Sequence, residues 1–285
     1  MNETKERGLL DDLISASKLY SSSEGYKQLL EFVVKLRTFA PFNAMLLHIQ
    51  KPGLNYAASA RDWRERFKRS IKPDARPLLI LWPFAPVALV YDVQDTEGAE
   101  IPARAFGFTA SGTINELKLS QMKDALEHFH ISVKEIDGGA DKAGSIRLTH
   151  EAQGKEPRKY SVSLNSNYSP AAKFATLVHE LGHLWLGHLG SDTHLKIQAR
   201  VGLSHDLREI EAESVAYILC KRNGVDVHSE QYLSGFINGD TWLDNLEIHK
   251  ILQAAGQAET KLGLSERISW DRKSSVQSAL FGDDD

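Results

Sequence analysis

Apolar residues recur at helical spacing in the first fifty residues and again through much of the second half of the chain. Within 24–38, for example, Tyr26, Leu29, Leu30 and Val33 are spaced as on one face of a helix. The segments in which this spacing predicts a helix are 4–20, 24–38, 42–50, 115–129, 170–188, 205–222 and 246–262.

Short apolar or alternating runs predict strands between these helices. "PLLILW" (77–82) and "VALVYDV" (87–93) flank the turn "PFAP", which predicts a hairpin. Further strands are predicted at 131–136, 144–150 and 158–165, and the last of these alternates apolar and polar residues as a half-buried strand does. A helix, three strands and two helices in this order predict an α+β fold.

A domain boundary is predicted near 105–112, because the segment 94–115 is rich in Gly, Thr, Ser and Asp and has no clear period. It separates a smaller N-terminal accessory domain of helices and a hairpin from the α+β domain. The resulting domains are 1–108 and 109–264, followed by a C-terminal tail at 265–285.

The composition is that of an ordinary globular protein. With 285 residues, 42% hydrophobic and 25% charged, the chain can bury a sizeable core. The single cysteine, Cys220, lies in an apolar helical pattern and is predicted to be a buried, inert thiol. The charged N-terminus lacks the apolar core of a signal peptide, and no apolar run approaches the ~20 residues that span a bilayer. We therefore expect a cytoplasmic protein with no membrane segment.

The candidate chemistry centres on "HELGH" (179–183). On a helix, His179 and His183 lie on one face, so that both imidazoles can bind one metal ion. Glu180 is about 100° further round the helix and can act as a general base beside the metal. Gly182 leaves room for a backbone or a ligand to pass close.

The context of this motif favours a metal site over a chance match. Ser169 and Pro170 predict a helix start upstream, and the two histidines lie off the apolar stripe of that helix. The apolar stripe consists of Phe174, Leu177, Val178, Leu181 and Trp185.

A third ligand is expected from the helix 205–222. Glu209 and Glu213 share a face of that helix, whereas Glu211 points about 200° away from Glu209. We assign Glu209 to the metal, and Glu213 to accept the free N–H of a histidine ligand. The reverse assignment of these two acids stays open. Together the ligands favour Zn²⁺.

Four further residues are candidates to stabilise an oxyanion, and spacing does not choose among them: Tyr168, His194, His205 and Tyr217. His188 is one residue short of the third-histidine position of the long metalloprotease motif, so we interpret it as a helix-end residue. The strand 158–164 is a candidate to pair with an extended peptide substrate.

"HELGHLWLGH" followed by "EIEAESVAYIL" resembles the ImmA/IrrE family of zinc metallopeptidases over roughly residues 145–225. The resemblance implies a zincin-like fold, with Glu209 as the third zinc ligand and Glu213 in the orienting role. The sequence departs from the family pattern at Glu213, where many relatives have Asn.

The first hundred residues resemble, more weakly, the N-terminal single-stranded-DNA-binding domain of ArdC-type antirestriction proteins. "FNAMLLHIQKP", Trp63 in a basic stretch, "LLILWP" and "VYDV" carry the resemblance. Although the chain has a formal net charge of −4, residues 61–76 hold seven Lys/Arg against three Asp/Glu. Candidate nucleic-acid contacts are Arg61, Trp63, Arg64, Lys68 and Arg69. Alternatively, the same segment is a helix that buries Trp63 and Phe67 and exposes its arginines.

These observations predict a zinc-dependent metalloendopeptidase that acts on a cytosolic protein, with Glu180 as the general base. The family resemblance implies a regulatory role, with a repressor or another DNA-associated protein as substrate. The rival prediction is a single-stranded-DNA-binding or antirestriction protein whose zinc site is structural or vestigial.

Overall fold

We describe the protein from a computed structural model, for residues 23–82, 85–99, 114–138, 143–154, 156–226 and 246–265. The fold is α+β, as predicted. The predicted helix at 4–20, the boundary near 105–112 and residues 266–285 of the predicted tail lie outside the described residues.

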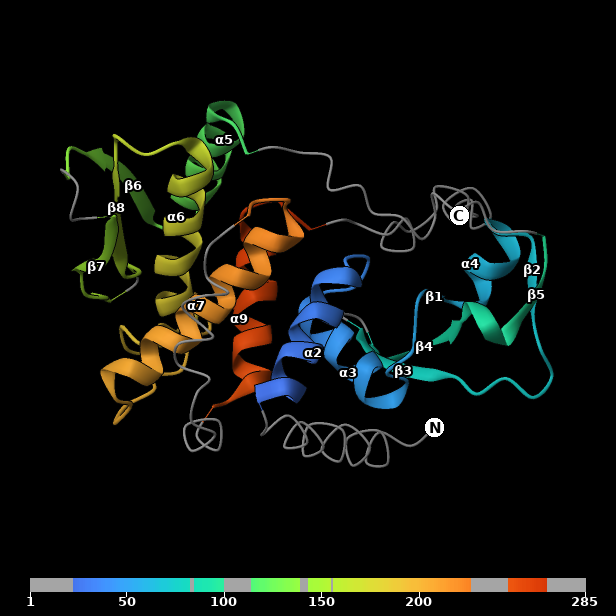
Figure 1. Ribbon diagram of the computed structural model, residues 1–285. Helices are drawn as coiled ribbons and strands as arrows, with labels where there is room; N and C mark the ends of the chain where they lie inside the picture. Colours follow the sequence, from blue (N-terminus) through green and yellow to red (C-terminus); the bar gives the residue numbers. More distant parts are fainter. Residues whose placement is uncertain are drawn as a thin grey trace, which may run out of the picture.

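A three-stranded sheet forms one end of the molecule (Figure 1). It consists of β6 (Ile131–Ile136), β8 (Lys159–Asn165) and β7 (Gly144–His150), in that spatial order. β8 pairs in parallel with β6 and antiparallel with β7. Because both edges of β8 are occupied, the expectation that strand 158–164 pairs with a substrate is wrong, and the edge strands are β6 and β7.

Helices pack beside the sheet in successive layers. α5 (Glu116–Glu127) contacts β6, and α6 (Pro170–Trp185) lies along β7 and β8. α7 (His205–Arg222) packs on α6, and α9 (Ile248–Lys261) contacts both of them. The sheet therefore backs α6, and α6 in turn faces α7.

The N-terminal helices belong to the same hydrophobic core as these layers. α2 (Ser23–Lys35) contacts α7, and α3 (Pro41–Gln50) contacts α9. One continuous cluster of buried side chains includes Leu29 and Met45 from these helices, and Leu219 and Ala255 from α7 and α9. α2 and α3, which the sequence analysis placed in the accessory domain, thus help to bury the helices of the second domain.

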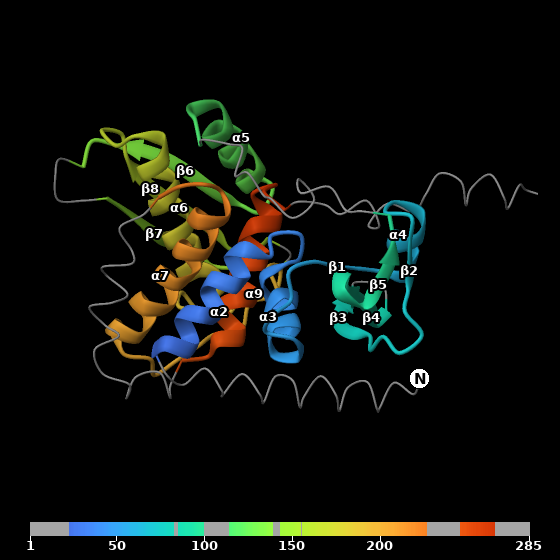
Figure 2. The ribbon, with the colours of Figure 1, turned by 45° about the vertical axis from the view of Figure 1, so that its right-hand side comes forward.

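A second group of strands lies on the far side of α3 from the sheet (Figure 2). β3 (Leu78–Trp82) and β4 (Ala85–Asp92) form the predicted antiparallel hairpin, and β1 (Ala57–Ala58) extends it. α4 (Ala60–Glu65), β2 (Arg69–Ile71), the 3-10 turn η2 (Val93–Asp95) and β5 (Thr96–Gly98) complete the group, with β2 antiparallel to β5.

Two amide side chains join α3 to the edge of this hairpin. Gln50 accepts a hydrogen bond from the Leu79 N–H (2.8 Å) and donates one to the Leu79 carbonyl (2.9 Å). Asn43 makes the same pair of bonds to Leu81, at 2.9 and 3.1 Å. The amides therefore take the place of a neighbouring strand along β3.

No helix within the described part of the chain is long and apolar enough to cross a membrane.

Candidate metal centre

His179 and His183 lie on the face of α6 that is not occupied by its buried apolar stripe. Ser169 caps α6 by accepting a hydrogen bond from the Ala172 N–H, and Pro170 occupies the first turn. The predicted apolar stripe is buried, whereas the side chains of His179 and His183 retain 22% and 15% exposure. The local sequence therefore sets both where the helix begins and which face carries the imidazoles.

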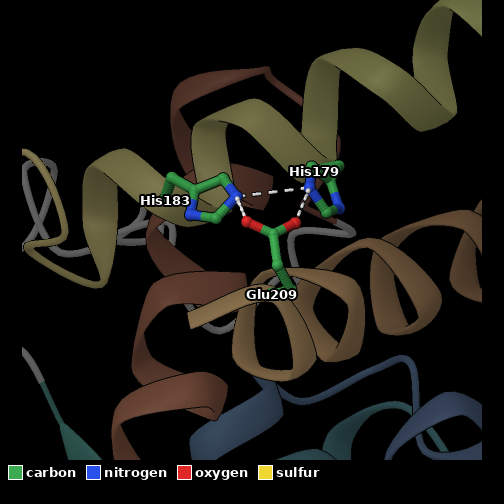
Figure 3. Close-up of side chains that lie close together, drawn as sticks. All are labelled: His179, His183 and Glu209. Carbon is green, nitrogen blue, oxygen red and sulfur yellow. Dashed lines mark hydrogen bonds and ion pairs between the residues drawn. The ribbon is translucent and has the colours of Figure 1, made fainter. Parts of the chain in front are cut away.

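α7 brings Glu209 to these two histidines (Figure 3). The Nε2 atoms of His179 and His183 are 3.2 Å apart, and each lies 3.4 Å from a different carboxylate oxygen of Glu209. One ligand atom from each residue lies within 4.8 Å of the other two. The structure thus gathers three metal-ligating groups from two helices that are adjacent in space.

The separations between these atoms fit a divalent metal ion. A tetrahedral ion with ligands at about 2.0–2.1 Å has neighbouring ligand atoms about 3.3–3.4 Å apart. The two Nε2 atoms, 3.2 Å apart, are close to that spacing, and each lies 3.4 Å from one oxygen of the Glu209 carboxylate. Two imidazoles and one carboxylate occupy three of four tetrahedral positions, which leaves one for water or substrate.

Glu213 lies where the second acid was predicted. One of its carboxylate oxygens is 3.1 Å from His179 Nδ1, on the side of the ring away from Glu209. An ionised carboxylate accepts the Nδ1–H, so the Nε2 lone pair is left for a metal. Of the two assignments that the sequence left open, this geometry favours Glu209 toward the metal and Glu213 behind the ring.

The acids and histidines perturb one another's pKa values. Burial lowers the pKa of His179, but hydrogen bonds to Glu209 and Glu213 outweigh it and raise the pKa to about 9. Burial and the positive charge on His179 lower the pKa of His183. The hydrogen bond from His179 is the main cause of the lowered pKa of Glu209. Without a metal, therefore, His179 is a positively charged imidazolium beside an ionised Glu209.

Glu180 stands beside the cluster, next to the edge strand β7. Burial raises the pKa of its carboxyl group, while the charge on His179 and a hydrogen bond from the Ile146 N–H act in the opposite direction. The Asn165 N–H donates to the Ala143 carbonyl, so by the register of the β7–β8 pair the Ile146 N–H points away from β8. A partly buried carboxylate with a raised pKa suits proton transfer near neutral pH.

The space beside Gly182 is taken by a backbone. A Cβ at this position would lie 3.2 Å from both the Cα and the carbonyl oxygen of Ala212 on α7. Of the two uses predicted for this glycine, the structure shows the close approach of a backbone. This approach holds α6 and α7 close enough for Glu209 to reach the histidines.

His188 is a helix-end residue, as predicted, but it also contacts the cluster. It follows the end of α6, but its Nδ1 lies 2.9 Å from His183 Nδ1, and its Nε2 lies 3.0 Å from Glu211. Glu211 in turn binds Arg200 through both carboxylate oxygens. The sequence reasoning missed these three residues. One available signal was the position of Glu211 between the apolar residues Ile210 and Ala212, because an acid in such surroundings needs a partner.

Among the oxyanion candidates, His205 contacts the cluster. His205 Nδ1 is 3.5 Å from Glu209, and its side chain is 76% exposed. The ring of His194 packs against His130, and that of Tyr217 lies near Lys221.

Residues 116–220 match the family model of the IrrE N-terminal-like domain, Peptidase_M78. The resemblance inferred from the two motifs is confirmed. The match begins at α5, earlier than residue 145, and includes the whole cluster of His179, His183 and Glu209.

Two solved structures of the antirestriction protein ArdC from plasmid R388 are similar to this chain. The metal-free structure shares 14% identity at a TM-score of 0.37, over 79% of this chain and 85% of ArdC. The Mn(II)-bound structure shares 17% identity at a TM-score of 0.40, over 78% and 82% of the two chains. No curated protein sequence matches the chain.

Among the predicted nucleic-acid contacts, Trp63 needs correction. Its side chain is fully buried, its Nε1–H donates to the Tyr91 carbonyl (2.9 Å), and its ring packs against Tyr56 and Phe67. In this conformation it cannot stack on a base. The alternative prediction, a helix that buries the tryptophan and exposes its arginines, describes α4 better.

The basic residues of the same segment differ in their surroundings. Arg69 donates to the side chain and carbonyl of Thr96 and to the Ala99 carbonyl, so its guanidinium group holds β5 against β2. Arg61 is exposed and paired with Glu65. Arg64 and Lys68 are exposed. Nucleic-acid contact by Arg61, Arg64 and Lys68 stays a prediction.

Proposed function

We propose that this protein is a zinc-dependent metallopeptidase that hydrolyses a peptide bond of another protein. The observation that carries the proposal is the convergence of His179, His183 and Glu209, whose ligand atoms lie within 4.8 Å of one another, with Glu180 beside them. Imidazole and carboxylate ligands with one open position are the donor set of catalytic zinc sites.

The zinc ion would be held by these three residues and would supply Lewis acidity, which lowers the pKa of water and polarises a carbonyl group. Glu180 takes a proton from the attacking water and passes it to the departing amide nitrogen. Glu213 holds the His179 ring in the tautomer whose Nε2 is free. The protein residues thus orient the ligands and move the proton.

The outward edge of β7 is the place where we expect an extended substrate to bind. Among the described residues, β7 pairs with β8 alone, and the Ile146 N–H on the other side of β7 already reaches Glu180. A peptide added antiparallel to this edge would run past the base. This edge replaces β8 as the candidate strand. The substrate class that the family resemblance implied, a repressor or DNA-associated protein, belongs to the same proposal.

A Glu180→Gln variant tests the proposal. Gln keeps the size of the side chain but cannot take a proton, so we expect unchanged zinc content and a loss of cleavage of about 10²–10⁴-fold. Glu127→Gln, an exposed acid on α5, is the matched control and should cleave at the wild-type rate. Cleavage of a peptide library would be followed by mass spectrometry. Zinc-loaded wild-type protein that cleaves no peptide, or a Glu180→Gln variant that cleaves normally, would contradict the proposal.

A further inference from the structure

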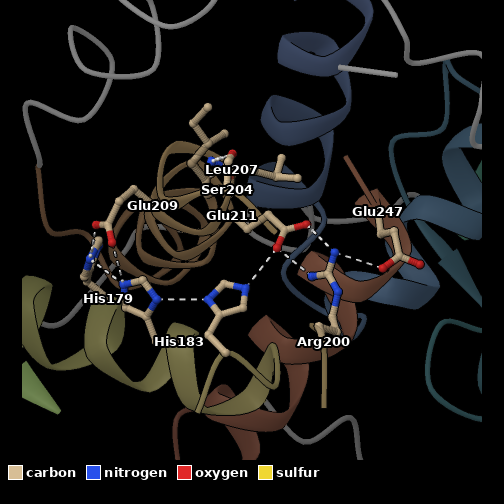
Figure 4. Close-up of polar contacts among 11 residues, drawn as sticks. His179, His183, Arg200, Ser204, Leu207, Glu209, Glu211 and Glu247 are labelled. Atoms are coloured by element: carbon tan, nitrogen blue, oxygen red, sulfur yellow. Dashed lines mark hydrogen bonds and ion pairs between the residues drawn. The ribbon is translucent and has the colours of Figure 1, made fainter. Parts of the chain in front are cut away.

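His188 is a buried histidine that touches a candidate metal ligand without facing the metal position. Its side chain is 2% exposed. Its Nδ1 is 2.9 Å from the Nδ1 of His183, whereas the Nε2 of His183 faces His179 and Glu209. His188 therefore lies behind the His183 ring, as Glu213 lies behind the ring of His179. Figure 4 shows Glu211 and Arg200 on the side of His183 that faces away from Glu209.

Behind His188 stands a buried ion pair. The Glu211 side chain is 0% exposed, and Arg200 binds both of its oxygens, at 2.5 and 2.8 Å. Arg200 also pairs with Glu247 (2.9 Å), at the start of α9. Both oxygens of Glu211 are bound by the guanidinium group of Arg200, which is always charged, and this contact keeps the carboxyl group ionised. Glu211 is thus an ionised carboxylate, which can only accept hydrogen bonds.

The hydrogen positions along this chain of contacts follow from that charge. Glu211 accepts from His188 Nε2, so His188 Nε2 carries a hydrogen, and in the neutral ring Nδ1 is then an acceptor. The 2.9 Å contact between the two Nδ1 atoms needs one hydrogen, which His183 must supply. A neutral His183 with Nδ1–H has its lone pair on Nε2, the atom that faces Glu209.

We propose that His188 is a positioning residue of the metal centre, which selects the tautomer and ring orientation of His183 because Arg200 and Glu211 select its own. The inference rests on the proposed function, since it takes the cluster to be a metal site. The two histidines of the cluster are then oriented differently: His179 directly by a carboxylate, and His183 through a second imidazole.

Two amide substitutions separate the two contacts of His188. Asn places its terminal polar atoms near the former Nδ1 and can still accept from His183, whereas Gln places them near the former Nε2 and can still reach Glu211. We expect His188→Gln to weaken Zn²⁺ binding about 10- to 100-fold, and His188→Asn to keep most of the affinity. The matched control is His128→Gln, an exposed histidine at the end of α5 and outside the cluster.

Affinity for Zn²⁺ would be measured on the full chain by competition with a chromophoric chelator, and the ligand field by the visible spectrum of the Co²⁺ form. Thermal melts of the metal-free variants report folding separately. A purely structural role for His188 predicts that Gln, which keeps the link to Glu211, is tolerated at least as well as Asn. Equal affinities of wild type and His188→Gln, or a larger loss in His188→Asn, would overturn the proposal.

The imidazole ¹⁵N spectrum of zinc-loaded wild-type protein tests the same claim without any variant. The expected pattern is a hydrogen on Nε2 of His188 and on Nδ1 of His183, and the opposite tautomer of His188 would overturn it. If the wild-type chain bound neither Zn²⁺ nor Co²⁺, the proposed function itself would fail. A chain that binds metal with the wrong tautomers refutes only the role of His188.

Discussion

Replacement of Arg222 by Met should strongly destabilise the protein, although the residue is remote from the metal centre. Arg222 lies in the last turn of α7 with its side chain 1% exposed. Its guanidinium group donates two hydrogen bonds to Glu259 on α9 and others to the carbonyls of Val33, Arg37 and Phe39. It therefore holds the end of α2 and the following turn to α7 and α9.

The size of the effect follows from what the substitution leaves behind. Met fills much of the volume but leaves Glu259, 3% exposed, as a buried charge without its partner. Loss of one member of a buried pair costs about 3–5 kcal/mol. The three carbonyls also lose a donor, at about 1–3 kcal/mol for each that water cannot reach. Against a total stability of about 5–15 kcal/mol, we expect a loss of at least about 4 kcal/mol.

Urea unfolding followed by far-UV circular dichroism measures this loss. Lys221→Met is the matched control at the neighbouring position. The ion pair that it removes, between Lys221 and the exposed Asp226, contributes about 0–1 kcal/mol. The double variant Arg222→Met/Glu259→Met should recover part of the stability, since no buried charge is then left alone. A loss below about 1 kcal/mol in the single variant would refute the claim that α2 depends on this pair.

Three further results are expected. The affinity for Zn²⁺ should rise about tenfold per pH unit toward pH 9, because the raised pKa of His179, about 9, means that a proton must leave before Nε2 can bind; a titration showing no change between pH 6 and 8 would contradict this. Gly182→Ala gains up to ~1 kcal/mol of helix propensity, but its Cβ would press on the Ala212 backbone at a cost of about 1–3 kcal/mol. We expect a net loss of stability in urea and weaker metal binding, and a variant more stable than wild type would refute the close contact. Gln50→Leu removes both bonds to Leu79 and should cost about 1–3 kcal/mol, with faster amide exchange in the hairpin; unchanged exchange would show that the hairpin does not depend on the amide.

The elements that carry the candidate metal centre could be predicted closely because their signals are local. Ser169 and Ser204 each cap a helix by accepting a hydrogen bond from an N–H three residues on. Spacing on a helix alone places the two histidines of HELGH on one face. Strands 131–136 and 144–150 have the predicted bounds, because apolar and polar residues alternate along a strand or clear turns flank it.

The errors in the prediction concern contacts between distant parts of the chain. Trp63 and Phe67 have the same spacing whether they stack on a base or pack against each other. The bond from the indole N–H to the Tyr91 carbonyl, 28 residues away, accompanies burial of the Trp63 ring. The order of strands in the sheet, which makes β8 central, depends equally on long-range pairing.

The sequence by itself determined which residue types meet on each helix face, because side-chain direction repeats with the backbone period. Only the tertiary structure decided that α7 approaches α6 at Gly182 and so brings Glu209 to the histidines. It also decided that His188, Glu211 and Arg200 form one buried chain of contacts behind His183. Buried polar groups need hydrogen-bond partners. Here the partners come from three separate segments of the chain, and local sequence patterns do not predict how those segments pack.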